Sequence, residues 1–295
     1  MTAVIVLAEQ EWQARQEAHV ARMRRWVEPH QERKAAGHKH PVLDFLFTYY
    51  SYRPTRLLRW HPGPDVALAG DARRHLSWTG YVQTPSGVML SREVLTEQRR
   101  TSVRFIRDLL VATQSRTPRL GCFGLHEWAM VYKAAEIRHE SLPLRLGSAG
   151  TDTVVESLPI RCGHFDAFRF FTPQARPLNA LQPTRPTQID LEQPGCLHAN
   201  MDLFKWSYKL APFTPSELLA DCFELASEVR ELDMRASPYD LSDFGYSPVP
   251  IETPAGRAAY VRMQAEFAER AAPLRARLIA LCTHILEWDQ PSRND

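Results

Sequence analysis

Apolar residues recur every three or four positions in several stretches of the chain, which is the spacing of a helix with one buried face. The first such stretch covers residues 8–28, and Pro29 is expected to end this N-terminal helix. Residues 214–217 form a capping box with proline at the first helical position, so a helix is expected to begin there. A longer helix is expected to begin at Pro254 and to be kinked at Pro273. The pattern as a whole favours helices.

Strand patterns are fewer and shorter. Residues 77–90 carry β-favouring side chains on both sides of a turn at 84–87, which predicts a hairpin. Short strands are also expected at 153–158 and 168–171, in a middle region rich in proline and glycine. We therefore predict a mainly α protein, with a single helical domain over residues 1–295 and a small antiparallel β-hairpin or sheet.

Charge separates the two halves of the chain. Residues 1–150 contain 22 lysines and arginines against 14 acidic residues, whereas residues 151–295 contain 14 against 20. The half up to about residue 150 is thus basic and rich in aromatic residues, and the acidic half is helical over residues 197–288. Because arginine binds phosphate as a planar fork, the basic half could face a polyanion. The alternative is a solvated surface whose arginines pair with local acids.

Composition also bounds the compartment. The cysteines are odd in number and scattered, which indicates reduced thiols rather than a disulfide framework; they are Cys122, Cys162, Cys196, Cys222 and Cys282. No stretch approaches the roughly 18 consecutive apolar residues of a membrane helix, and the opening residues are too short and acidic for a signal peptide. We therefore expect a cytoplasmic protein that does not act at a membrane.

Residues 49–61, the aromatic–arginine segment, alternate aromatic side chains with arginines. Aromatic rings stack on bases and arginines anchor phosphates, so this composition suits a site for a flipped base or a single strand. The candidate nucleic-acid-binding residues are Tyr49, Tyr50, Arg53, Arg56, Arg59 and Trp60. The alternative is a buried aromatic cluster whose arginines point outward.

Four histidines are each followed closely by a carboxylate: His126 by Glu127, His164 by Asp166, His198 by Asp202, and His40 by Asp44. Asp202 and Asp44 lie four residues after their histidines, so we expect each to pair with the histidine one turn back. A buried histidine–carboxylate pair can act in acid–base catalysis or can simply tie helix ends together. The candidate catalytic residues are Asp202, His198, Asp44, Glu127 and His126.

The same side chains suggest a metal site as an alternative. His164 and Asp166 with a distant histidine match the facial arrangement of ligands in non-haem iron enzymes. The candidate ligands of a divalent metal are His126, His164, Asp166 and His198. We expect at least two of the three segments that carry these residues to meet in one pocket.

Four motifs carry a family resemblance: KHPVLDFLFTYYSYRPTRLLRWHPG, LHEWAMVY, CLHANMDLFKW and SPYDLSDFGYSPVPIETPAGRAAYVRMQ. From about residue 40 to 290 the chain resembles actinobacterial proteins that carry the name 3-methyladenine DNA glycosylase. The resemblance implies a DNA repair enzyme that hydrolyses the N-glycosidic bond of an alkylated base without a cofactor. It implies a carboxylate from Asp202 or Asp44 near the sugar, and DNA as the partner. The helix-hairpin-helix turn of the best-known helical alkyl-base glycosylases is missing from the sequence.

Two other functions stay open on the residues alone. One is a metal-dependent enzyme, with non-haem iron or a similar ion, that acts on a small molecule. The other is a nucleic-acid-binding protein without catalysis. The regular apolar face of the last predicted helix could also form a homodimer.

Overall fold

In the computed structural model of the chain, residues 3–134 and 142–288 are described. Over these residues the structure has twelve α-helices and one four-stranded sheet, which confirms a mainly α protein. The helices are α1 Glu9–Ala35, α2 Phe45–Tyr49, α3 Pro54–Leu57, α4 Arg73–Leu76, α5 Glu97–Gln114, α6 Leu125–Ala129, α7 Gly147–Ser157, α8 Phe165–Phe168, α9 Gln188–Leu191, α10 Leu197–Lys209, α11 Ser216–Arg235 and α12 Pro254–Glu287. The strands are β1 Ile5–Leu7, β2 Val66–Leu68, β3 Tyr81–Thr84 and β4 Gly87–Leu90.

The helix starts that were predicted from capping signals are confirmed. Helix α11 begins at Ser216, inside the predicted capping box. Helix α12 begins at Pro254, and the Thr253 hydroxyl accepts a hydrogen bond from the backbone N–H of Gly256 at 3.0 Å. This bond satisfies one of the donors that a helix start leaves free. Helix α12 also continues past Pro273.

Helix α1 does not end at Pro29 as predicted but runs to Ala35. A proline inside a helix costs about 3 kcal/mol, so packing beyond it must compensate. Val27 and His30 are both buried, and the His30 ring bonds the carboxylate of Asp44 at 2.9 Å. The buried face of the helix therefore continues through the proline.

The strands predicted at 153–158 and 168–171 are wrong. Residues 147–157 form helix α7, and Phe168 ends helix α8. Val154 and Val155 are buried on α7, which shows that packing overrides the modest preference of β-branched residues for strands.

The predicted hairpin is confirmed as β3 and β4, and it belongs to a sheet with strand order β1-β2-β4-β3. Gly87 has φ +125°, and a Cβ at this position would lie 2.3 Å from the Leu68 carbonyl oxygen, so the turn requires glycine. The β2–β4 and β4–β3 pairs are antiparallel, whereas β1 pairs with β2 in parallel, which the sequence did not predict.

Contacts group the chain into two compact units. Unit 1 comprises residues 1–108, 203–224 and 274–295, and unit 2 comprises residues 109–202 and 225–273. The prediction of a single domain stays a prediction.

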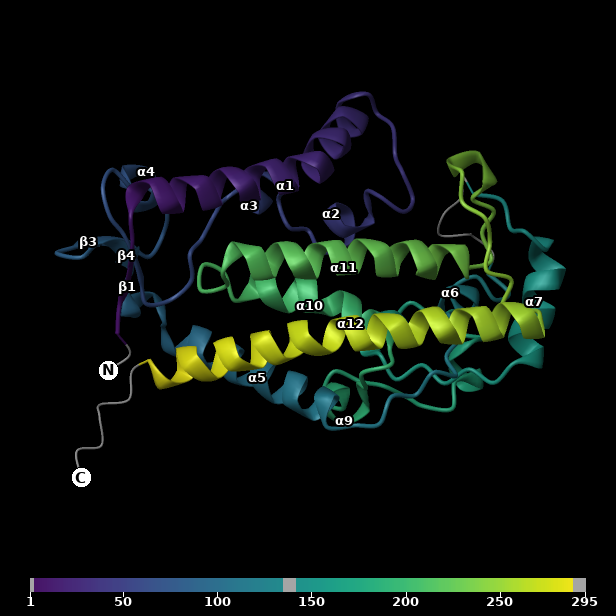
Figure 1. Cartoon of the computed structure of the whole chain (residues 1–295). Coiled ribbons are helices and arrows are strands. Elements are labelled where there is room, and N and C mark those ends of the chain that lie inside the picture. The colour runs from purple at the N-terminus through teal and green to yellow at the C-terminus, as the bar shows by residue number, and fades with distance from the viewer. Residues whose placement is uncertain (1–2, 135–141, 289–295) are drawn as a thin grey trace. The chain divides into compact units, whose positions relative to one another are not determined.

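Unit 1 contains the sheet and helix α1, whose first turns lie beside the sheet (Figure 1). The Trp12 indole on α1 donates to the Ala69 carbonyl, one residue after β2, at 2.8 Å. Aromatic rings fill much of the remaining interior of this unit, with Tyr50, Phe204 and Phe223 among them.

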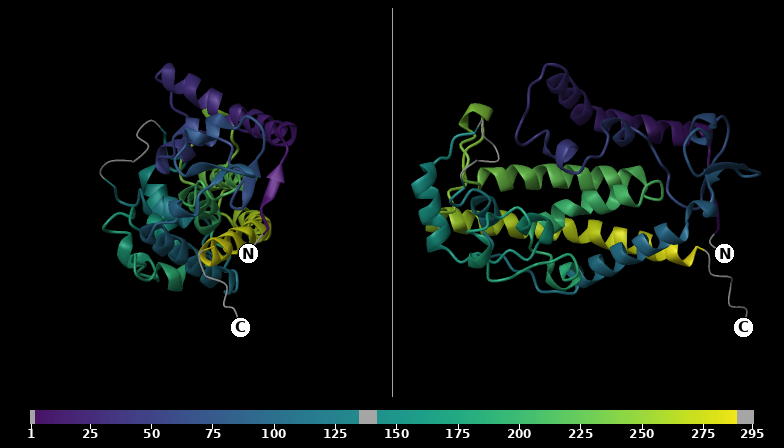
Figure 2. Two further views of the ribbon diagram at one scale, coloured as in Figure 1. Left: turned by 90° about the vertical axis from the view of Figure 1, so that its left-hand side faces the viewer. Right: turned by 180° about the vertical axis from the view of Figure 1, so that it is seen from behind.

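Unit 2 is built differently. Between α7 and α9 its chain runs mostly as loops with short helices (Figure 2). Its interior holds several buried charged and polar side chains, including Arg230, Asp233 and Asp202. Buried charges must be paired or must bind a ligand, so these side chains are candidates for a functional site. Within the described part of the chain, no helix has both the length and the apolar character needed to cross a membrane.

Candidate active site

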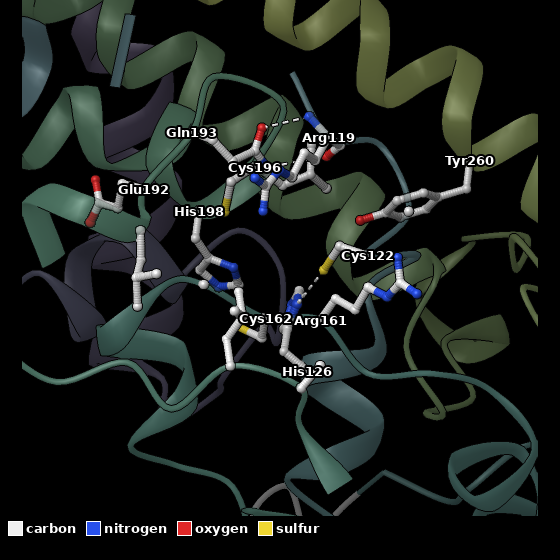
Figure 3. Close-up of a pocket in the computed structure, with 16 residues that line it drawn as sticks. Arg119, Cys122, His126, Arg161, Cys162, Glu192, Gln193, Cys196, His198 and Tyr260 are labelled. Atoms are coloured by element: carbon white, nitrogen blue, oxygen red, sulfur yellow. Dashed lines mark hydrogen bonds between the residues drawn. The ribbon is translucent and has the colours of Figure 1, made fainter. Parts of the chain in front are cut away.

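One cavity of about 280 Å³ lies wholly within unit 2 (Figure 3). Its wall includes polar side chains from several separate segments: Cys122 and His126, Arg161, Glu192 and His198, and Tyr260. The volume is near the lower end of the roughly 300–1,000 Å³ that ligand pockets occupy. A small molecule fits such a space.

Two histidines line the cavity, and each lies near the start of a helix. Phe123 and Gly124 have positive φ angles of 49° and 69°, and this turn leads directly into α6, which carries His126. His198 lies in the first turn of α10. His164 precedes α8 and lies behind the cavity wall, with its ring stacked on that of His198 at 5.2 Å.

The first group of close ligand atoms comprises His126, His198 and Asp233, whose donor atoms lie within 4.8 Å of one another. His126 Nε2 lies 2.7 Å from Asp233 Oδ1. On the other side of the imidazole, His126 Nδ1 lies 3.9 Å from Cys122 Sγ. The His126 and His198 rings meet edge to face, with centroids 4.3 Å apart. All three side chains of the group are buried.

A buried arginine supports this group. Arg230 Nη1 donates to Asp233 Oδ2 at 2.8 Å and to Glu127 Oε1 at 2.9 Å, and the Arg230 side chain is only 1% exposed. Glu127 therefore pairs with Arg230 and lies next to the first group.

The surroundings of the first group shift the pKa values of its two histidines in opposite directions. Burial alone would lower the pKa of His126, but the Asp233 carboxylate raises it well above its ordinary value. Burial and the neighbouring His126 charge lower the pKa of His198 well below its ordinary value. Burial also opposes the ionisation of Asp233, yet the His126 charge lowers the pKa of that carboxyl. Without a ligand, the favoured state is a charged His126–Asp233 pair beside a neutral His198.

The second group comprises His164, Glu192 and Asp202, whose donor atoms also lie within 4.8 Å of one another. His164 Nε2 lies 3.0 Å from Asp202 Oδ2 and 3.6 Å from Glu192 Oε1. The Gln188 amide donates to Glu192 Oε1 at 2.6 Å. His164 Nδ1 is buried and has no hydrogen-bond partner among the described residues.

The segments around residues 126, 164 and 198 thus meet, as predicted, but one predicted pairing and one candidate metal ligand differ. Asp202 was expected to pair with His198, and the structure places it against His164. Asp166 joins neither group, because its carboxylate accepts from Arg185 at 3.1 Å.

The sequence prediction missed three members of the site: Asp233, Arg230 and Glu192. Asp233 and Arg230 lie on α11, which was expected to be an ordinary amphipathic helix. The available signal was the position of Asp233 between Leu232 and Met234, both apolar and both buried. A carboxylate in such a setting needs a partner from elsewhere in the fold.

Asp44, the other candidate catalytic carboxylate, lies in unit 1 and has several partners of its own. It accepts from Arg33 Nη2 at 2.6 Å, from the His30 ring at 2.9 Å and from the His40 backbone N–H at 2.8 Å. Burial alone would raise the pKa of Asp44, but Arg33 and His30 lower it. These contacts join α1 to the start of α2, a structural role.

The aromatic–arginine segment also lies in unit 1, and its two kinds of side chain separate. Trp60 is fully buried and donates to Glu217, and Tyr50 packs on Phe204. Tyr49 is half-buried and stacks on Phe45 with ring centroids 5.0 Å apart. The exposed side chains are Arg53, Arg56 and Arg59, and none of them has an ion pair with an acid in residues 3–134 or 142–288. Trp60 and Tyr50 are therefore out of reach of a base, while the arginines face solvent.

Comparison with known proteins gives no match to the chain among protein-family models, curated proteins or solved structures.

Proposed function

We propose that the protein is a divalent-metal-dependent enzyme that acts on a small molecule in the unit 2 cavity. The observation that carries the proposal is the first group, in which two imidazoles and a carboxylate from three elements have donor atoms within 4.8 Å of one another. Two ligands that each lie about 2.0–2.2 Å from one ion are at most about 4.4 Å apart, so only a small adjustment is needed.

The donor set suits a first-row ion, because imidazole and carboxylate ligands bind zinc, iron and manganese. Metal-bound histidines usually donate their second N–H to a partner that fixes the ring, and ligating carboxylates are themselves hydrogen-bonded. Cys122 stands in that position for His126, and Arg230 does so for Asp233. These two contacts support the assignment of His126 and Asp233 as metal ligands.

The second group fits an ion less well. If His164 bound through Nε2, its proton would move to Nδ1, which has no acceptor within the described chain. If the ring instead donates from Nε2 to Asp202, Nδ1 carries no proton, and no buried N–H is left without an acceptor. We therefore assign the ion to the first group and a supporting role to His164 and Asp202.

His126 and His198 belong both to the first group and to the cavity wall, so an ion held there would face the contents of the cavity. Such an ion would act as a Lewis acid that polarises a substrate oxygen or activates a water molecule. The chain itself contributes the fixed ligand shell and the enclosed cavity.

A cobalt titration tests this assignment. Chelator-treated protein is titrated with Co²⁺ and followed by visible absorption, which reports the coordination of the ion. We expect saturable absorption that is lost in His198→Gln and retained in His38→Gln, since His38 is exposed and belongs to neither group. Equal absorption in the two variants would place the ion elsewhere, and none in the wild type would refute the proposal.

Base excision on DNA is a second candidate function, favoured by the three exposed arginines of the aromatic–arginine segment and by the family resemblance. Such an enzyme acts on a base that is already cationic and needs no metal. Release of 3-methyladenine from alkylated DNA by chelator-treated protein would support this candidate against the metal-dependent one.

A further inference from the structure

Tyr260, on α12, presents a polar atom to the cavity without a partner. The side chain is fully buried, and its hydroxyl has no hydrogen bond to any described residue. Burial raises the pKa of Tyr260 well above its ordinary value, so the hydroxyl keeps its proton and is a donor. In Figure 3 the hydroxyl points into the cavity. A buried donor without an acceptor is costly, and a bound ligand that accepts from it removes the cost.

Two arginines at the cavity add positive charge. Arg119 and Arg161 both line it, and both side chains are exposed. Neither guanidinium forms an ion pair with an acid in the part of the chain that the structure describes. An unpaired guanidinium presents a fork of N–H donors that matches a carboxylate or a phosphate.

The rest of the wall limits the kind of molecule that can bind. Leu181, Leu191 and Leu197 contribute apolar side chains to the wall. The acid on the wall, Glu192, already accepts from Gln188. The free donors therefore suit an anionic group, and the leucines suit the apolar part of a ligand.

We propose that the cavity binds a small molecule with an oxyanionic group, a carboxylate or a phosphate, held by Arg119, Arg161 and the Tyr260 hydroxyl, with its apolar part against the leucines. This substrate class rests on the proposed function for its reaction, but binding of the anion does not require the metal ion.

Calorimetry on chelator-treated protein tests the proposal with three probes: hexanoate, phenyl phosphate and hexylamine. We expect one anion to bind and the amine not to bind, and the anion that binds identifies the group. The double variant Arg119→Gln/Arg161→Gln should weaken binding at least tenfold, and so should Tyr260→Phe, which keeps the ring. Arg262→Gln is the matched control, because Arg262 is exposed on the same helix but does not line the cavity.

The outcomes separate this inference from the proposed function. Equal affinity in the wild type and both cavity variants would overturn it, as would the absence of anion binding at 10 mM. Binding that appears only after metal is restored and is indifferent to the arginines would place the anion on the ion, which refutes this inference and leaves the metal site intact. Circular dichroism of each variant is the control for whether the fold is kept.

Discussion

Arg230→Met removes the cation from between two buried carboxylates. In the wild type the guanidinium lies 2.9 Å from Glu127 and 2.8 Å from Asp233, and no side chain of the three is more than 7% exposed. Removing one partner of a buried ion pair costs about 3–5 kcal/mol, because the remaining charges are left without compensation. With an unfolding entropy of about 2.1 cal/mol/K per residue, each kcal/mol shifts the melting temperature of a 295-residue chain by roughly 1.6 °C, so a fall of roughly 5–8 °C is expected.

The assay is thermal unfolding of chelator-treated protein, with Arg270→Met as the matched control. Arg270 pairs with Glu228 at 2.7 Å in the same unit, but both side chains are 49% exposed, and such surface pairs contribute no more than about 1 kcal/mol. Burial raises the pKa of Glu127, so the deficit of the Arg230 variant should shrink as the pH is lowered and the carboxyl takes up a proton. Equal melting temperatures for the two variants would refute the reasoning about this buried network.

Three further predictions concern unit 1. Burial lowers the pKa of His61 to about 3, so between about pH 6.5 and pH 3 the unfolded chain binds a proton that the folded chain does not. His61→Gln should therefore reduce the loss of stability in this range by up to about 1.4 kcal/mol per pH unit. The stability is measured by urea unfolding at several pH values, and the same dependence of stability on pH in the wild type and the variant would contradict this. The lowered pKa of Asp44 stabilises the fold at neutral pH and this contribution is lost as the carboxyl is protonated in acid, so Asp44→Asn should be destabilised at pH 7 but approach the wild type in acid unfolding curves. Replacing Arg53, Arg56 and Arg59 by Gln should leave the melting temperature unchanged. If the protein binds DNA, the replacement should lower the slope of log affinity against log salt concentration by about 0.9 for each phosphate that these arginines neutralise. An unchanged slope would mean that the arginines do not bind phosphates.

The sequence predicts helices well where the signal is local. The capping residues before α11 and the Thr253–Pro254 start of α12 act through neighbouring backbone groups, so a short stretch of sequence contains the whole cause. Pro29 and residues 153–158 misled the prediction because burial against distant residues outweighed a local preference.

The site shows the same limit. The histidine segments were recognised because histidine beside carboxylate is a local pattern, but the partners are distant: His126 pairs with a carboxylate 107 residues away, and His164 with one 38 residues away. Spacing along a helix cannot reveal such pairs. Composition likewise could not show that Trp60 is buried while the arginines beside it are exposed. A nucleic-acid site and a buried aromatic cluster with outward arginines have the same composition.

The most direct test of the central claim is the metal content of the purified protein by mass spectrometry, in the wild type and in two matched variants. Asp233→Asn alters the first group, and Asp202→Asn alters the second. We predict about one first-row ion per chain in the wild type and in the Asp202 variant, and less than about a tenth of that in the Asp233 variant. A wild type that carries no ion and takes none up from a metal-supplemented buffer, or an Asp233 variant that retains the full content, would contradict the account.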